Sequence, residues 1–216
     1  MGAPDPVQLL TALTTEHFTL QGARSQTMSE TSARASVYMY SVSSALVALG
    51  FVSQVADGVG VVFTVFALTV LPVIYFLGCA TYVRLVECGA EDLRYGMAIN
   101  RIRGYYKELA DDRADLFLLS GHDDAAGVFL NMGLSPSRRS PAFAFSTAVA
   151  VVNGVVGGAV AGLALGAVPG VQLWLATTVG VLVAAASIFG WLRHAARILE
   201  AAASQVTPRF PSPSPD

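Results

Sequence analysis

Four long apolar stretches dominate the pattern of hydrophobic and polar positions along the chain. They cover residues 35–55, 59–83, 142–168 and 171–192, and none of them contains Asp, Glu, Lys, Arg or His. A helix rises 1.5 Å per residue, so about 20 residues cross the ~30 Å hydrocarbon core of a bilayer. The pattern therefore predicts an all-α membrane protein with four transmembrane helices. These form two hairpins, closed by short turns at residues 56–58 and 169–170.

Composition supports this class and excludes others. Of the 216 residues, 54% are hydrophobic and 13% charged, with a mean hydropathy of +0.57. Soluble domains carry about 25% charged residues. A net charge of −2 gives no field that would attract nucleic acid, so no nucleic-acid partner is expected. Two cysteines cannot build a disulfide framework.

The distribution of basic residues predicts the orientation in the membrane. All 13 lie in the N-terminal segment, the central segment or the C-terminal tail, and none lies in the turns within the hairpins. By the positive-inside rule, both termini and the central segment are cytoplasmic. Because arginine, alanine, glycine and valine are abundant, as in GC-rich bacterial genomes, we expect a multi-pass protein of a bacterial plasma membrane.

The segments outside the hairpins also read as helices. Residues 1–34 form a cytoplasmic N-terminal helix, and 84–141 an amphipathic helix followed by a short helical linker. The hairpins occupy 35–83 and 142–192, and the cytoplasmic tail 193–216 is expected to be disordered after Ser204, where prolines cluster. The helices of the first hairpin are therefore expected to extend into the cytoplasm.

An apolar face on the extension of the second span is the predicted cytoplasmic interaction face. Its residues recur at helical spacing, and a thinner stripe on the N-terminal helix is its expected partner in a short antiparallel stalk. Alternatively, the face lies on the bilayer surface. The face comprises Tyr95, Ile99, Ile102, Tyr106 and Leu109, and the stripe Leu10, Leu13, His17, Leu20, Arg24 and Met28.

After this helix, Asp111 and its neighbours predict a break. The run His122-Asp123-Asp124 offers N-cap chemistry for a short helix that stops at Gly133. A metal site is the alternative for this run. Because a second set of His or Cys ligands is missing, helix capping is the preferred interpretation and no metal is assigned.

The third span carries a row of glycines at four-residue spacing, and the fourth answers with small residues at the same spacing. Such faces permit close helix approach. They pack against each other within the hairpin, or the glycine face builds a homo-oligomer and lines a pore. The residues are Gly154, Gly158, Gly162 and Gly166, and Ala176, Gly180 and Ala184.

Signatures of catalysis are missing from the sequence. It has no phosphate-binding glycine loop, no HExxH, no GxSxG and no carboxylate within a span. We therefore expect no enzymatic activity, no catalytic residues and no cofactor.

Two resemblances add to this picture. Residues 98–106 (AINRIRGYY) and 118–124 (LLSGHDD) resemble those of actinobacterial multi-pass membrane proteins. Separately, the layout of residues 10–110 is similar to the SLATT and Pycsar-type membrane effectors of bacterial nucleotide-signalling defence. That resemblance implies a pore-forming assembly under a cytoplasmic signal, but no site residue is carried over.

Together these patterns predict a non-enzymatic membrane protein of oligomeric assembly or regulation. Its expected partners are the lipid bilayer, further copies of the chain, and a cytoplasmic protein or a nucleotide signal. The alternative function is a channel or pore-forming effector gated through the cytoplasmic helices. An enzyme with a cytoplasmic site is the third.

Overall fold

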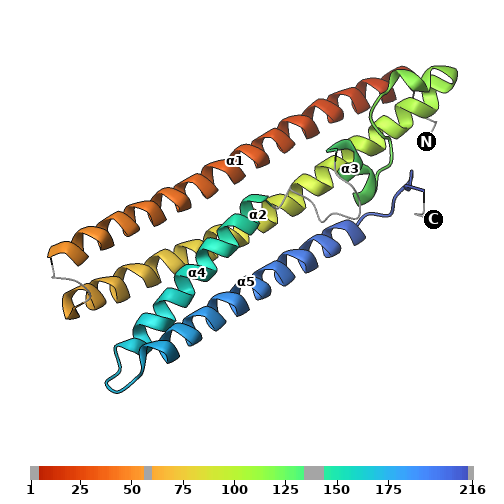
Figure 1. Cartoon of the computed structure of the whole chain (residues 1–216). Helices are drawn as coiled ribbons and strands as arrows, with labels where there is room; N and C mark the ends of the chain where they lie inside the picture. Colours follow the sequence, from red (N-terminus) through yellow and green to blue (C-terminus); the bar gives the residue numbers. More distant parts are fainter. Residues whose placement is uncertain (1–4, 56–59, 134–143, 214–216) are drawn as a thin grey trace. The chain divides into compact units, whose positions relative to one another are not determined.

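The computed structural model describes residues 5–55, 60–133 and 144–213, and these ranges are helical with no strand. Figure 1 shows the elements along the chain. The described ranges contain four long helices, and two short helices lie between the second and the third of them: α1 (Pro6–Val55), α2 (Val61–Ala110), the 3₁₀ helix η1 (Asp111–Leu116), α3 (Ala125–Asn131), α4 (Ala144–Gly166) and α5 (Leu173–Ser204). The prediction of an all-α protein is confirmed.

Four helices are long and apolar enough to cross a membrane, as the hydropathy pattern predicts. Both α1 and α2 have 50 residues, which corresponds to about 75 Å of helix. This is more than twice the thickness of a bilayer core, so each helix continues beyond its apolar part, as expected. The predicted turn at 169–170 is present, with Gly170 at φ +85°, whereas residues 56–58 lie outside the described residues.

The breaks after α2 and α3 follow from local backbone chemistry. Helix α2 ends at Ala110 because Asp111 adopts a left-handed φ of +47°. Asp124 caps α3 by accepting a hydrogen bond from the Gly127 N–H at 2.7 Å, and Gly133 follows the helix at φ +73°. The predicted break, cap and stop are confirmed.

The chain forms two compact units. Unit 1 consists of Met1–Glu30, Glu87–Ala142 and Ile198–Asp216, and unit 2 of Thr31–Val86 and Phe143–Arg197. The boundaries fall within α1, α2 and α5. Each unit is described by itself below, for its described residues.

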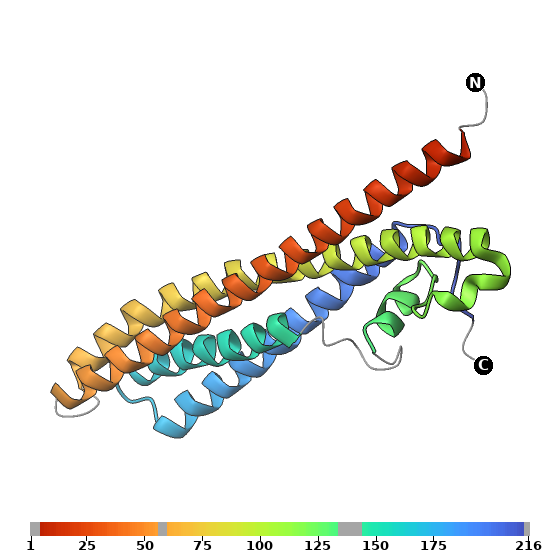
Figure 2. The same cartoon turned by 90° about the horizontal axis from the view of Figure 1, so that it is seen from above.

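Unit 2 is a bundle of helices around an apolar core. In Figures 1 and 2 the unit 2 part of α1 runs beside that of α2, and α4 runs beside α5. On α1 the buried positions recur every three or four residues, which is the spacing of a helix seam. These positions are Ala35, Tyr38, Val42, Ala45 and Leu49.

Unit 1 has a smaller core where three segments meet. Leu93 and Met97 of α2 and Val128 of α3 are buried together. The end of α5 and the chain after it complete this cluster through Leu199, Ala203 and Val206. The prediction of disorder after Ser204 is therefore wrong for residues 205–213, because Val206 packs on the core and later residues are hydrogen-bonded to unit 1.

Candidate interaction sites

An ion pair joins α1 to α2 within unit 1. The Arg24 guanidinium donates from Nε to Asp92 Oδ1 at 2.7 Å and from Nη2 to Asp92 Oδ2 at 3.1 Å. The Asp92 side chain is 5% exposed and that of Arg24 28%. Further along the same two helices, the Thr14 and Tyr106 hydroxyl oxygens lie 3.3 Å apart. These contacts bring together the N-terminal helix and the extension of α2.

The predicted interaction face on α2 is only partly covered. Ile99 and Ile102 are buried, and Tyr95 and Tyr106 are half-buried. Leu109 is 57% exposed, so it lies outside the packed part of this face. On α1, Met28 of the predicted stripe is also exposed, because the buried position in this turn is its neighbour Thr27.

The polar face of α2 is covered rather than solvated. Asn100 is 3% exposed and donates from Nδ2 to the His122 carbonyl at 2.8 Å. Its Oδ1 accepts from Arg103 Nη1 at 2.6 Å and from Asn131 Nδ2 at 2.9 Å. This network holds the loop before α3 and the end of α3 against α2, which the helical pattern alone did not predict.

The chain after α5 binds to this same face, at a set of residues that we call the tail site: Arg101, Gly104, Gly121, Asp123 and Asp124. Asp123 is fully buried. Its Oδ2 accepts from the Arg209 N–H at 3.0 Å, and its Oδ1 from the Phe210 N–H at 2.7 Å. Arg101 Nε also binds Asp123 Oδ2, at 2.5 Å. Asp123 thus binds the tail and does not cap α3.

Asp124 binds the next residues of the tail. Its Oδ2 accepts from the Ser212 N–H at 2.6 Å, and its Oδ1 from the Ser212 hydroxyl at 2.7 Å. The same carboxylate caps α3. One aspartate therefore fixes both the start of a helix and a distant segment of chain.

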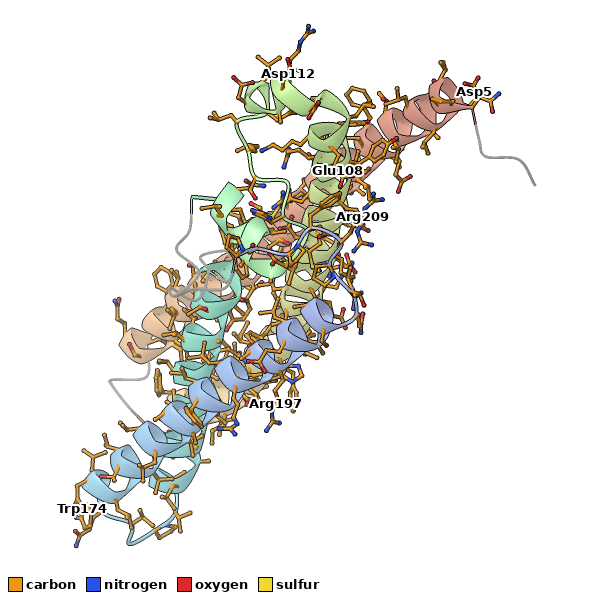
Figure 3. The ribbon with its side chains drawn as sticks, turned by 90° about the vertical axis from the view of Figure 1, so that its right-hand side faces the viewer. Asp5, Glu108, Asp112, Trp174, Arg197 and Arg209 are labelled. Atoms are coloured by element: carbon orange, nitrogen blue, oxygen red, sulfur yellow. The ribbon has the colours of Figure 1, made fainter. Side chains whose placement is uncertain are left out.

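The Phe210 ring packs against the backbone at Gly104, a position without a side chain, and Gly121 lies beside Gly104. A Cβ atom at Gly104 would overlap the Phe210 ring, and one at Gly121 would lie 2.9 Å from the Gly104 Cα. The Arg209 guanidinium lies 5.2 Å from the centroid of the Phe210 ring and binds Glu108 at 3.2 Å. Glu108 and Arg209 are labelled in Figure 3. The two glycines therefore allow an aromatic ring to approach the α2 backbone.

The hydrogen bonds of the tail site decide the charge of its two aspartates. Burial raises the pKa of Asp123, but the N–H groups of Arg209 and Phe210 and the Arg101 guanidinium outweigh it, and the pKa lies below its ordinary value. Burial likewise opposes ionisation of Asp124, and the N–H groups of Ser212 and Gly127 again make the net shift of the pKa downward. Both carboxylates are ionised at neutral pH.

A groove lies between α1 and α2 in unit 1, where α1 diverges from α2 towards its N-terminal end (Figure 2). Its volume is about 460 Å³. Apolar side chains dominate the wall from α1, and basic side chains are placed along the opposite wall. The lining includes Leu9, Leu13, Leu20, Arg94, Arg101 and Arg209.

Within unit 2, Asn153 of α4 is fully buried in a polar cluster. The Tyr38 hydroxyl of α1 donates to Asn153 Oδ1 at 3.1 Å, and Asn153 Nδ2 lies 3.4 Å from Cys79 Sγ of α2. A Cβ atom at Gly78 would overlap the Asn153 amide. An interhelical amide with both ends bonded is a packing device of apolar bundles.

The glycine row of α4 faces α5 of the same chain. A Cβ atom at Gly158 would overlap the Gly180 carbonyl oxygen, and one at Gly162 would lie 3.2 Å from the Ala176 carbonyl oxygen. At Gly166 the nearest atom, the Ala176 Cβ, would be 3.6 Å away, which is ordinary contact. The hairpin thus covers this face, and an oligomer of this arrangement would have to use another surface.

Over the ranges that the structure describes, no group of three His, Cys, Asp or Glu side chains is placed to hold a metal ion. No protein family matches the chain, and no curated protein or solved structure matches it either. The resemblances noted from the sequence therefore remain predictions.

Proposed function

We propose that this chain is a non-enzymatic multi-pass membrane protein that assembles with further copies of itself through unit 1 on the cytoplasmic side. In this proposal the apolar parts of α1, α2, α4 and α5 cross the membrane. The plasma membrane of a bacterium, with both termini cytoplasmic, is the location that the arginine distribution supports.

Contacts within unit 1 support the even number of crossings in this topology. Asp92 binds Arg24, which precedes the first pair of apolar segments, and Asp123 binds Arg209, which follows the second pair. Each of these pairs joins a residue that precedes a hairpin in the sequence to one that follows it. Two such residues can lie on the same side of a membrane only if the hairpin between them crosses it an even number of times. This argument does not use the arginine count. It supports an even number of crossings for each hairpin, while the proposed cytoplasmic side rests on the arginines alone.

Complementary surfaces of unit 1 carry the proposal of self-assembly. The α1–α2 groove is lined by leucines and three arginines, with Glu16 as its one acidic residue. Arg101 binds Asp123 and Arg209 binds Glu108 of the same chain, so Arg94 is the arginine that a partner's acid would meet. Residues 108–119, which we call the acidic segment, carry the opposite net charge together with exposed leucines. Glu108 pairs with Arg209 of its own chain and Arg113 is the one basic residue of the segment, so the exposed Asp111, Asp112 and Asp115 supply the charge. Leu116 and Leu118 are 77% and 94% exposed. We propose that the acidic segment of one copy occupies the groove of another.

Charge reversal tests this assembly. Arg94 is exposed and lines the groove, and Asp112 lies on the acidic segment. Arg94→Glu or Asp112→Arg alone should shift the protein towards the monomer in native mass spectrometry from nanodiscs. An equimolar mixture of the two variants should form heterodimers, because one intact and one doubly reversed interface remain available.

The matched control is Glu200→Arg, which reverses an exposed acid on α5 outside both surfaces. It should leave the assembly unchanged. A wild-type protein that stays monomeric at all concentrations, or oligomers that tolerate both reversals, would refute self-assembly through these surfaces. Reporter fusions after Gly170 and after Pro213 test the topology separately, with the first expected outside the cytoplasm and the second inside.

A channel or pore-forming effector is the second candidate function. The observation in its favour is the polar cluster of Tyr38, Cys79 and Asn153 inside the unit 2 bundle. Purified protein in planar bilayers should then conduct ions, and Asn153→Leu should change the current while the oligomer persists. Intact oligomers without current would favour the assembly function.

A further inference from the structure

The tail site recognises its ligand mainly through the main chain. The N–H groups of Arg209, Phe210 and Ser212 all donate to carboxylates of the site. In the other direction, the Phe210 carbonyl accepts from the Asp123 N–H at 3.1 Å, and the Thr207 carbonyl from Arg101 Nη2 at 2.5 Å. Recognition of a short segment through its main-chain N–H and C=O groups is a recurring form of peptide binding.

Side chains of the segment add selectivity. The Phe210 ring lies on the floor formed by Gly104, where any Cβ would displace it. Arg209 pairs with Glu108, and the Ser212 hydroxyl binds Asp124. The site thus selects an aromatic residue, a preceding cation and a serine two positions after the aromatic residue, which is the sequence Arg-Phe-Pro-Ser of residues 209–212.

Without a ligand, the site would be costly to maintain. Asp123 and Asp124 are adjacent carboxylates, and three main-chain N–H groups of the tail neutralise part of their charge. Arg101 would be left as the remaining charged partner of Asp123. An empty site would leave both carboxylates without these N–H donors, which is strongly disfavoured for buried groups. We therefore expect the tail to leave the site only when a segment with the same groups replaces it.

We infer that unit 1 carries a peptide-binding site for an Arg-Phe-Pro-Ser segment, and that this segment is also supplied in trans by the tail of a second copy. A second copy brings the same segment and therefore makes the same contacts. The link through residues 205–208 gives the chain's own tail a high effective concentration, so exchange requires copies held close together. For that proximity, though not for binding of the peptide itself, the inference rests on the proposed assembly.

Binding is tested with a peptide of residues 205–216 and a chain that ends at Val206. The fluorescent peptide should bind the shortened protein saturably in anisotropy measurements and bind the full chain at least tenfold more weakly. The peptide with Phe210→Ala should lose at least tenfold in affinity, and that with Arg209→Ala only a few-fold, because the Arg209 ion pair is exposed. A scrambled peptide that binds equally well would overturn the site.

A second experiment uses full-length chains and decides the question even if the shortened protein does not fold. One variant carries Asp123→Asn with Asp124→Asn and a photo-crosslinking residue in place of Pro213. The other carries Phe210→Ala and retains an intact site. Mixing should give a covalent heterodimer, linked between the tail of the first and unit 1 of the second, and excess peptide should abolish it.

Exchange between copies is overturned if the mixed chains are assembled, as judged by native mass spectrometry, but never cross-link. If the charge-reversed variants abolish assembly while the peptide still binds, the peptide site stands and exchange between copies fails. If assembly survives but the peptide does not bind, the site is refuted and the proposed function is not.

Discussion

Arg24 of α1 binds both carboxylate oxygens of Asp92 on α2, and the Asp92 side chain is only 5% exposed. A paired charge of this kind adds little net stability, but a partner left alone in the same place is strongly destabilising. The pair therefore specifies how α1 and α2 are aligned more than it stabilises them.

Removing one partner of this pair should destabilise unit 1 more than removing both. Arg24→Met leaves the buried Asp92 carboxylate without its guanidinium, at a cost of about 3–5 kcal/mol. Arg24→Met with Asp92→Leu should recover most of this loss. Thermal unfolding in detergent measures both variants, and equal destabilisation of the single and double variants would contradict the assignment.

Gly78 should tolerate no side chain. Gly78→Ala places a Cβ where the Asn153 amide and the Tyr38 ring lie, and overpacking of this kind costs about 1–3 kcal/mol. Gly50→Ala is the control, because a Cβ there meets nothing within 4 Å, and alanine is the better helix former by about 0.5–1 kcal/mol. The melting temperature should fall for the first variant and stay level or rise for the second.

The glycine row of α4 should show a graded response along its length. Gly158→Ala should destabilise the hairpin, because the new methyl meets the Gly180 backbone, whereas Gly166→Ala should be nearly neutral. Melting temperature and oligomeric state should be measured together. A Gly158→Ala variant with unchanged melting temperature but altered oligomeric state would place the glycine face between copies rather than within the hairpin.

Acid should release the tail from unit 1. The pKa values of Asp123 and Asp124 lie below the ordinary value near 4 when the tail is bound. The two carboxylates therefore bind protons less readily with the tail bound than with the tail released. Binding is therefore at full strength above about pH 4 and is lost as pH falls through the lowered pKa values. Hydrogen exchange of the N–H groups of residues 209, 210 and 212, corrected for intrinsic rates with a free peptide, measures this.

The control for this experiment is the Asp123→Asn, Asp124→Asn chain. Its tail should exchange rapidly at every pH, because an amide cannot offer two acceptor oxygens to the N–H groups of residues 209, 210 and 212. Protection that persists in this variant would show that packing of Phe210 and Val206 holds the tail without the carboxylates.

Periodicity was sufficient to predict the long helices, since spacing along one helix is a local property. The break at Asp111, the cap at Asp124 and the stop at Gly133 were predictable for the same reason: each depends on a residue and its near neighbours. The Arg24–Asp92 contact was predictable only in part. The helical spacing placed Arg24 on the face of α1 that packs on α2, but it did not identify Asp92 as its partner.

The tail site was not predictable in this way. A helix face with Asn100 and Arg101 has the same pattern whether water or protein covers it, and the covering segment lies 86 residues beyond Asp123. Two signals in the sequence could have indicated it. Gly104 and Gly121 are glycines next to polar positions, and Phe210 is the single aromatic residue among the prolines and serines of the tail.

The distance along the chain between Asp123 and Phe210 also sets an order of events during synthesis. Asp123 is synthesised before α4 and α5, and its carboxylate lacks its N–H partners until residues 209 and 210 have been made. In the proposed topology, a nascent chain in which only one of these two helices had inserted would leave the tail on the wrong side of the bilayer. Closure of unit 1 would then serve as a checkpoint for complete insertion of the second hairpin, and failed chains would display an open site to quality-control proteases.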